Sequence, residues 1–294
     1  MEYIRMSSDI VFKQGYNEYI IDATRDLDLS FSSTDDAEVF ITVRKCGKLR
    51  IRGFMNAGTQ THILFSNEAD ETLEVDESYE VLRDAHLTVA YAECNAADTK
   101  RSCFVALRRP GASARVTNAL LVNSRKEYAV NVVNFAPHTS GNIENYAVVL
   151  KHGNLVIDAI GKIVKGAKQS ESHQSSHALS FEMGQKAKIL PELLIDENDV
   201  QASHALSMGT VDEDQLYYLM SRGLSVEQCT SLISTGYLLP VTQVIQNEDL
   251  QQRLKEAMER KIDELCSMSM KSEKIFQCLL IILSLSILIM EQHL

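Results

Sequence analysis

Short runs in which apolar and polar residues alternate fill the middle of the chain. The runs are rich in valine, isoleucine, leucine and aromatic residues, and glycine, asparagine or charged residues separate them. Such alternation is typical of β-strands with one buried face, and no sustained helical period interrupts it. The pattern therefore predicts a β-rich body over residues 36–209. The runs lie at residues 38–44, 48–54, 61–66, 86–93, 103–109, 127–136, 145–153 and 154–166.

The connections between these runs favour stacked parallel coils over an antiparallel meander. Two-residue Asn-Gly or Asp-Gly turns, which hairpins commonly use, are few. Residues 154–200 instead alternate small, polar and apolar residues continuously, with brief glycine corners. Stacked coils tolerate this pattern, because the side chains of each coil pack on the next one. No clean repeat is present, so a β-sandwich and a barrel stay open while a β-helix is favoured.

The pattern changes to a helical period after residue 210, which predicts a small helical domain over residues 210–265. Asp212 and Gln215 have the spacing of a capping box, and Gly223 is a natural stop for the helix that they begin. Ser225 and Gln228 repeat the capping signature. A last helix follows. Its apolar positions at helical spacing are Leu250, Leu254, Met258, Ile262 and Leu265.

Two terminal segments differ from this body. Residues 1–35 are polar and weakly patterned, and they are expected to form a short N-terminal segment without the features of a secretory signal. Residues 266–294 form an atypical apolar tail. Its most apolar part, residues 275–290, is shorter than the roughly 20 residues that span a bilayer. A membrane anchor, a packed helix and an aberrant C-terminus stay open as interpretations of this tail.

Charge and motifs exclude several functions. A formal net charge of -11 argues against a nucleic acid partner, since such proteins carry a basic face. The six cysteines are scattered without a C-x-x-C pair, which predicts reduced thiols in the cytoplasm rather than a zinc site or a disulfide framework. The chain has no Walker-type phosphate loop, so it is not expected to hydrolyse ATP, and it has no G-x-S-x-G motif of the α/β-hydrolase type.

Three segments resemble a known family. They are "KGAKQSESHQSSHAL", "KILPELLIDENDVQASHALSMGTVDEDQLYYLMSRGLS" and "STGYLLP". Their order and spacing are similar to the SufB/SufD family of iron–sulfur cluster assembly proteins, most strongly from about residue 120 to 262. Ala205 follows His204, where SufB members tend to have a His-Glu pair, and no cysteine lies in residues 181–195. The chain therefore looks most like the SufD branch.

The resemblance implies a fold, partners and a location. The fold is a right-handed parallel β-helix followed by a small C-terminal helical domain. The β-helix would pair with a SufB-like protein, the C-terminal helices would dock the ATPase SufC, and the complex would be cytoplasmic; alone, the chain could form a homodimer. It would be no enzyme and would hold no cofactor stably, only a transient iron–sulfur cluster at the subunit interface. Relatives commonly carry a helical domain ahead of the β-helix, for which residues 1–35 leave little room.

His204 is the candidate residue for the shared assembly site, because the resemblance implicates a histidine at this position. It shares strand parity with Val200 and Ala202. A neutral imidazole can offer one nitrogen to iron, whereas the structural alternative is a buried or interface histidine satisfied by one hydrogen bond. Iron–sulfur clusters take several ligands, mostly thiolates, so the others would come from the partner.

Other candidate residues have more ordinary interpretations. His173 and His177 lie in a predicted strand, where four residues separate side chains by about 13 Å, so they are not expected to bind one ion together. The acidic run at residues 196–199 is expected to be a solvated turn.

Tyr217, Tyr218 and Arg222 are candidates for docking the ATPase, since tyrosine and arginine are enriched in binding hot spots. Packing of one tyrosine against the helical domain is the structural alternative. Two other functions remain open: a β-helical carbohydrate-active enzyme, which would need charged residues clustered along one groove, and a membrane protein anchored by residues 275–290.

Overall fold

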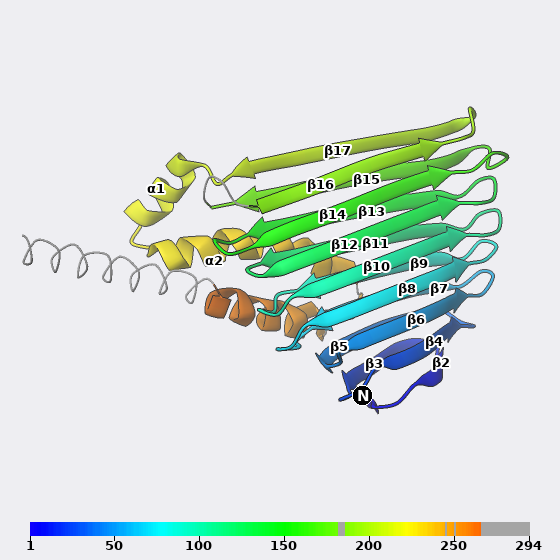
Figure 1. Cartoon of the computed structure of the whole chain (residues 1–294), viewed down its shortest axis with the longest axis horizontal. Coiled ribbons are helices and arrows are strands. Elements are labelled where there is room, and N and C mark those ends of the chain that lie inside the picture. Colours follow the sequence, from blue (N-terminus) through cyan, green and yellow to red (C-terminus); the bar gives the residue numbers. More distant parts are fainter. Residues whose placement is uncertain (182–185, 245, 250, 266–294) are drawn as a thin grey trace, which may run out of the picture.

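The computed structural model describes residues 1–181, 186–244, 246–249 and 251–265. Odd-numbered strands form a nine-stranded sheet and even-numbered strands form an eight-stranded sheet, so each strand pairs with strands two positions away in the chain. The pairing is parallel at both ends and in the middle of the stack. A chain that alternates in this way between two facing walls is a parallel β-helix, as Figure 1 shows. The predicted fold is confirmed.

The strands of the nine-stranded sheet are β1 (Glu2–Ile4), β3 (Gly15–Asp22), β5 (Ala37–Lys45), β7 (Gln60–Asn67), β9 (His86–Glu93), β11 (Ser113–Val122), β13 (Ser140–Val149), β15 (Ser170–Ser180) and β17 (Val200–Thr210). The strands of the eight-stranded sheet are β2 (Ser8–Phe12), β4 (Leu27–Ser33), β6 (Lys48–Met55), β8 (Leu73–Val81), β10 (Thr99–Leu107), β12 (Arg125–Asn134), β14 (Asn154–Ile163) and β16 (Lys186–Ile195). Alternate side chains of both sheets meet in one interior core.

The β-helix begins at Glu2, whereas the sequence analysis placed its start at residue 36. Strands β1–β4 occupy the segment that was expected to lie outside the coil. In β4, Leu27, Leu29 and Phe31 are buried and the residues between them are not, so the alternation does continue here. It was missed because aspartate and serine fill the outward positions and the apolar runs are short.

The corners of the coil stack by backbone hydrogen bonds. On one rim a residue with positive φ recurs in successive coils, and its N–H donates to a carbonyl of the next coil over 2.6–3.1 Å. At Gly111 a Cβ atom would approach Asp84 Oδ1 to 1.9 Å, so this corner needs glycine. Glycine, which was predicted for the corners, therefore occupies only some of them, and non-glycine residues occupy the others. The corner residues are Gly58, Asp84, Gly111, His138 and Gln169.

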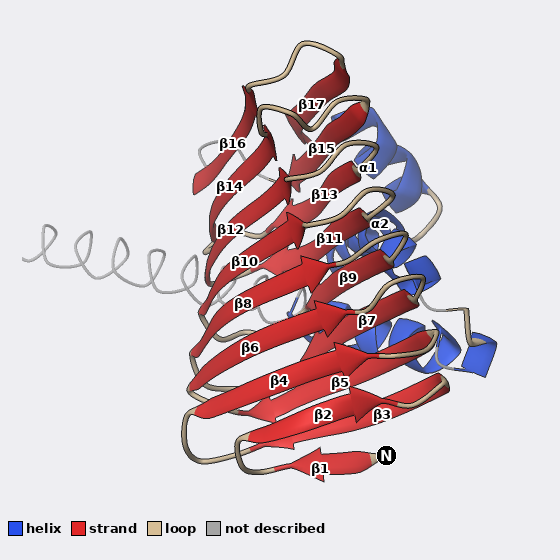
Figure 2. Ribbon diagram, turned by 90° about the vertical axis from the view of Figure 1, so that its right-hand side faces the viewer, coloured by secondary structure: helices blue, strands red, loops and turns tan. Residues whose placement is uncertain are grey.

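Helices cover the outer face of the nine-stranded sheet (Figure 2). They are α2 (Val226–Leu238), the 3-10 helix η1 (Leu239–Val244) and a C-terminal helix at residues 251–265, whereas α1 (Glu213–Ser221) has no buried residue and lies beyond the carboxyl end of β17. Small outward side chains of the sheet, such as Ala90 and Ala119, leave room for Met258 and Ile262 to pack closely. From α2 onward, the predicted helical domain therefore shares a core with the sheet and is not a separate unit.

The C-terminal helix is also tied to the first coils by polar contacts. The carboxylate of Glu38 accepts hydrogen bonds from the backbone N–H groups of Gln246 and Asn247, both at 3.3 Å. Further along, the guanidinium of Arg253 donates to Glu18 Oε1 at 2.9 Å. These contacts fix the helix along the length of the coil. The predicted apolar tail at residues 266–294 lies outside the described residues, and no helix among those described is long and apolar enough to cross a membrane.

Ser225→Ala should lower the free energy of unfolding by about 1 kcal/mol, because Ser225 caps α2. Its hydroxyl accepts from the N–H of Gln228, and Gln228 Oε1 accepts from the backbone N–H of Ser225, so the predicted capping box is confirmed. Urea unfolding of the full chain measures the effect. Ser221→Ala is the matched control, since that exposed hydroxyl donates only to the Tyr218 carbonyl of its own helix. Equal losses in the two variants would contradict a capping role.

Candidate functional site at the open end of the β-helix

One end of the β-helix, which we call the open end, is formed by the last strand of each sheet. Among the described residues, β16 and β17 each pair with a strand on one side only. Interior-facing side chains of β17 are therefore exposed: Leu206 is 44% exposed and Met208 is 46% exposed. Ser176 and Ala178 hold the same positions one coil below, where they are buried. Unpaired strand edges beside apolar side chains form a surface that pairs readily with another chain.

His204 lies in the middle of β17 at this open end. Its partner in the register is Gln174 of β15, whose side chain faces the interior and is only 4% exposed. The same register gives Val200 and Ala202 interior-facing positions. The predicted strand parity of these three residues is therefore confirmed. His204 therefore faces the interior side of the last coil, and its side chain is exposed there.

The buried form of the structural alternative does not describe His204 here, while an interface histidine stays an open interpretation. The side chain is exposed, and within the described part of the chain its ring makes no hydrogen bond. The same part of the chain holds no group of three or more His, Cys, Asp or Glu side chains placed to bind a metal ion. A metal or cluster at His204 would therefore need ligands from a second chain, since one imidazole fills a single position.

His173 and His177 lie on the outer face of β15, as predicted. The ring of His173 contacts Ser203 Oγ at 2.7 Å and lies 3.8 Å from a Glu171 oxygen. The ring of His177 stacks instead on Tyr146, with a centroid separation of 5.7 Å. The two histidines thus have different neighbours, and the structure does not bring them together.

Helix α1 carries the predicted docking residues on an uncovered surface. No residue of α1 is buried, and Tyr217 and Tyr218 are 75% and 55% exposed. The guanidinium of Arg222 lies over the Tyr218 ring, 5.0 Å from its centroid. Packing of one tyrosine into a core, the structural alternative, is not observed. In Figure 1, α1 lies beyond the carboxyl end of β17, which is one of the two strands that form the open end.

The acidic run at residues 196–199 is an exposed connection between strands, as expected, except at Glu197. Glu197 is buried, and its carboxylate accepts hydrogen bonds from the backbone N–H groups of Gly166 and Asn198, both at 2.9 Å. These N–H groups lower the pKa of Glu197. The carboxylate therefore holds two successive corners of the coil together, and it has a structural role.

A buried ionic cluster in the middle coils was missed by the sequence analysis. The guanidinium of Arg101 on β10 donates to Glu77 of β8 and, at 3.2 Å, to Glu93 of β9. The ammonium group of Lys126 on β12 lies 4.0 Å from the same Glu93. All four side chains are almost fully buried. The sequence did contain a signal for this cluster, because charged residues stand at interior-facing positions where the strand pattern calls for apolar ones.

Cys103 lies inside this cluster, but its surroundings do not activate it. Tyr91 donates hydrogen bonds to Cys103 Sγ at 3.3 Å and to Glu77 at 3.0 Å. Burial raises the pKa of the Cys103 thiol, and the neighbouring Glu77 carboxylate raises it further. Because the nucleophile in cysteine chemistry is the thiolate, this thiol is held in its unreactive form. The cluster is a structural feature of the coil interior.

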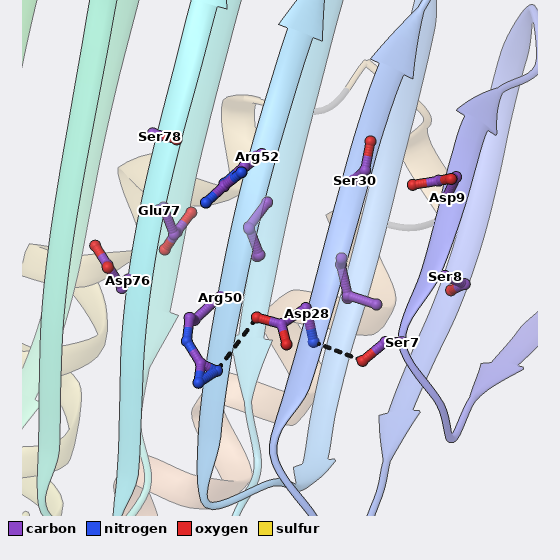
Figure 3. A pocket seen from close by; sticks show the side chains of 12 residues that line it. Ser7, Ser8, Asp9, Asp28, Ser30, Arg50, Arg52, Asp76, Glu77 and Ser78 are labelled. Atoms are coloured by element: carbon purple, nitrogen blue, oxygen red, sulfur yellow. Dashed lines mark hydrogen bonds and ion pairs between the residues drawn. The ribbon is translucent and has the colours of Figure 1, made fainter.

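A pocket lies far from the open end, on the outer face of the eight-stranded sheet. It has a volume of about 620 Å³ and is lined by strands β2, β4, β6 and β8 (Figure 3). Charged side chains do gather there, which the sequence analysis did not expect. Arg50 pairs with Asp28 at 3.2 Å, so part of this charge is neutralised on the sheet itself.

Together, the fold and the open end define a β-helical protein with an exposed last strand that carries the candidate residue His204. The chain belongs to the SufBD core domain family of the SUF system for FeS cluster assembly, whose family model matches residues 54–237. This confirms the resemblance seen in the sequence.

Relatives in this family carry names from both branches. The chain is 35% identical to the iron–sulfur cluster assembly protein SufD of Bacillus subtilis over 137 residues, which cover 47% of this chain and 31% of the relative. It is 24% identical to SufB of the same organism over 224 residues, covering 74% of this chain and 45% of the relative. A SufBD family protein of Pyrococcus horikoshii is 38% identical over 81 residues, or 28% of this chain and 18% of the relative. The chain spans less than half the length of these relatives.

Proposed function

We propose that this chain is a SufD-like subunit of a cytoplasmic SUF complex, in which it pairs with a SufB-like protein through the open end and docks a SufC-like ATPase through its helices. The observation that carries the proposal is the exposed interior face of β17 with His204 at its centre. A second β-helix ending in the same way would pair with the unpaired edges of β16 and β17 and bury the apolar side chains. The likeness to SufD supports this branch over SufB.

The iron–sulfur cluster is the cargo of such a complex. His204 would offer one imidazole nitrogen to the nascent cluster, and the thiolate ligands would come from the partner. Covering the open end would remove this site from water, which a labile cluster requires. The chain itself would act as a scaffold, not as an enzyme, and ATP hydrolysis would belong to the ATPase.

The helices offer a route by which the ATPase could act on the open end. Only Val211 and Asp212 separate β17 from α1. The N–H of Val211 donates to the Ser180 carbonyl at 2.8 Å, so the connection starts from a fixed point on the sheet. A force applied at Tyr217 or Tyr218 would thus reach the edge strand that carries His204 through a short covalent path.

The proposal is tested by co-expressing the full chain with SufB-like and SufC-like proteins of the same source. We expect a complex that contains all three on size-exclusion chromatography with mass detection. The chain expressed alone is the control for self-association. A full chain that folds, as judged by circular dichroism, but joins neither protein would overturn the proposal.

A double change of Tyr217→Ala and Tyr218→Ala should weaken binding of the SufC-like ATPase by about two orders of magnitude, since exposed aromatic hot spots contribute at least about 2 kcal/mol. Arg222→Ala should weaken it less, because it removes only the cation that lies over Tyr218. Titration calorimetry of the ATPase into the chain measures both. Gln215→Ala, an exposed change on the same helix, is the control. Unchanged affinity in the double variant would exclude α1 as the docking surface.

A further inference from the structure

The coil directly below the open end has an unusually polar interior. Four alternate residues of β15 face inward and are buried: Ser170, Ser172, Gln174 and Ser176. On the opposite wall, Gly161 makes room for them. A Cβ atom at Gly161 would lie 2.3 Å from Ser172 Oγ and 2.9 Å from Gln174 Nε2. The glycine therefore lets the long side chain of Gln174 cross the interior of the coil.

The hydrogen bonding of Gln174 fixes the orientation of its amide group. Gln174 Nε2 donates to the backbone carbonyl of Glu192 on β16 at 2.8 Å. A carbonyl can only accept, so the amide nitrogen must face Glu192 and the amide oxygen must face elsewhere. That oxygen, Gln174 Oε1, is buried and has no hydrogen-bond partner. An unsatisfied buried acceptor is costly and calls for an explanation.

The register shows which neighbour can supply the missing donor. Side chains on the same face of adjacent parallel strands stand beside one another, with the strands about 4.8 Å apart. Below Gln174, the neighbouring position is Ile143, which has no polar side-chain atom. Above it, the neighbouring position is His204, whose ring has two nitrogens and no partner within the described part of the chain. The free acceptor and the free imidazole are thus adjacent in one ladder.

We infer that Gln174 is the positioning residue of His204: when a partner covers the open end, Gln174 Oε1 accepts the N–H of the imidazole and leaves the other ring nitrogen free for the shared site. This inference rests on the proposed function. A histidine that serves as a ligand commonly donates its second nitrogen to an acceptor, which fixes both its tautomer and its orientation. Gln174 supplies that acceptor from below, and its own position is fixed by Glu192 and Gly161.

The test measures the tautomer of His204 in the complex with the SufB-like partner. Histidine labelled with nitrogen-15 gives long-range proton–nitrogen correlations that distinguish the two neutral tautomers, and His204→Gln identifies the signal. We expect one tautomer in the natural chain and a mixture of both in Gln174→Met, which has no acceptor. Gln174→Glu also loses the donor to Glu192 but keeps an acceptor, so it should retain the single tautomer. This pair separates the acceptor role from the contact with β16.

Ser172→Ala is the matched control, because Ser172 lies in the same buried layer below Ala202. It should leave the His204 tautomer unchanged. A single tautomer in Gln174→Met, or the same mixture in the control, would overturn the inference while the proposed function stands. Size-exclusion chromatography of the same samples separates the two failures, since absence of a complex with the natural chain overturns both the proposed function and the role of Gln174.

Discussion

Arg101→Met should lower the free energy of unfolding by about 3–5 kcal/mol, because it leaves two buried carboxylates without their shared cation. Arg101 is fully buried and donates to both Glu77 and Glu93. Methionine fills much of the volume, so the loss reports the missing charge more than a cavity. Unfolding in urea, followed by far-ultraviolet circular dichroism, measures the change.

Arg50→Met is the matched control for this experiment. Arg50 of β6 makes an exposed ion pair with Asp28 of β4 on the outer face of the same sheet. Exposed pairs contribute at most about 1 kcal/mol, so this variant should stay close to the natural chain. Similar losses for Arg50→Met and Arg101→Met would mean that the buried cluster adds nothing beyond a surface pair.

The same cluster predicts a dependence on pH. Burial by itself would raise the pKa of Glu93, but the charges of Arg101 and Lys126 outweigh it and hold the pKa below its ordinary value. A lowered carboxyl pKa contributes stability above the unfolded value of about 4.3, and that contribution is lost as the pH falls through the folded value. In Arg101→Met the folded pKa of Glu93 rises, so acid unfolding should begin at a higher pH than in the natural chain.

Leu206→Asp should weaken binding of the SufB-like partner by at least about two orders of magnitude. Leu206 holds an interior-facing position in the last strand at the open end and is 44% exposed in the chain alone. Covering it in an interface would bury an unpaired carboxylate, which is costly, whereas the separate chain keeps that charge in water. The variant should therefore fold normally and fail only in binding, as titration calorimetry with the partner would show.

Val11→Asp places the same charge at the opposite end of the stack. Val11 on β2 is 58% exposed, so the change is comparable in exposure and chemistry. The variant should bind the partner as the natural chain does. Equal weakening by both changes would point to a general effect of charge, and equal binding would exclude the open end as the interface.

The sequence pattern predicted the β-helix but missed strands where polar residues face inward. In β8 the buried Glu77, and in β11 the buried Asn118, break the apolar alternation at interior positions. The partners that satisfy them lie on other coils: Glu77 meets Arg101, and Asn118 donates to Asn145 at 2.6 Å. A local pattern cannot register such pairs, because they are formed by residues more than twenty positions apart in the chain.

The candidate site could likewise be predicted only in part from the sequence. The family segments and the strand parity of His204 were visible in the sequence, since both depend on residues that are close in the chain. The exposure of His204 and the unsatisfied acceptor of Gln174 could not be predicted from the sequence. Both depend on β17 being the last described strand of its sheet. Glu197, expected in a solvated turn, was misjudged for a related reason: its hydrogen-bond donor Gly166 comes from the preceding corner of the coil.

The sequence by itself determined the β-rich body, the helical period after residue 210 and the cap at Ser225, because alternation, helical spacing and capping are local properties of the chain. Only the tertiary structure decided that residues 1–35 join the coil, that the C-terminal helix shares a core with the nine-stranded sheet, and that His204 lies on the last strand among the described residues. Each of these depends on which coil packs against which, and stacking is a contact between distant residues that no short stretch of sequence records.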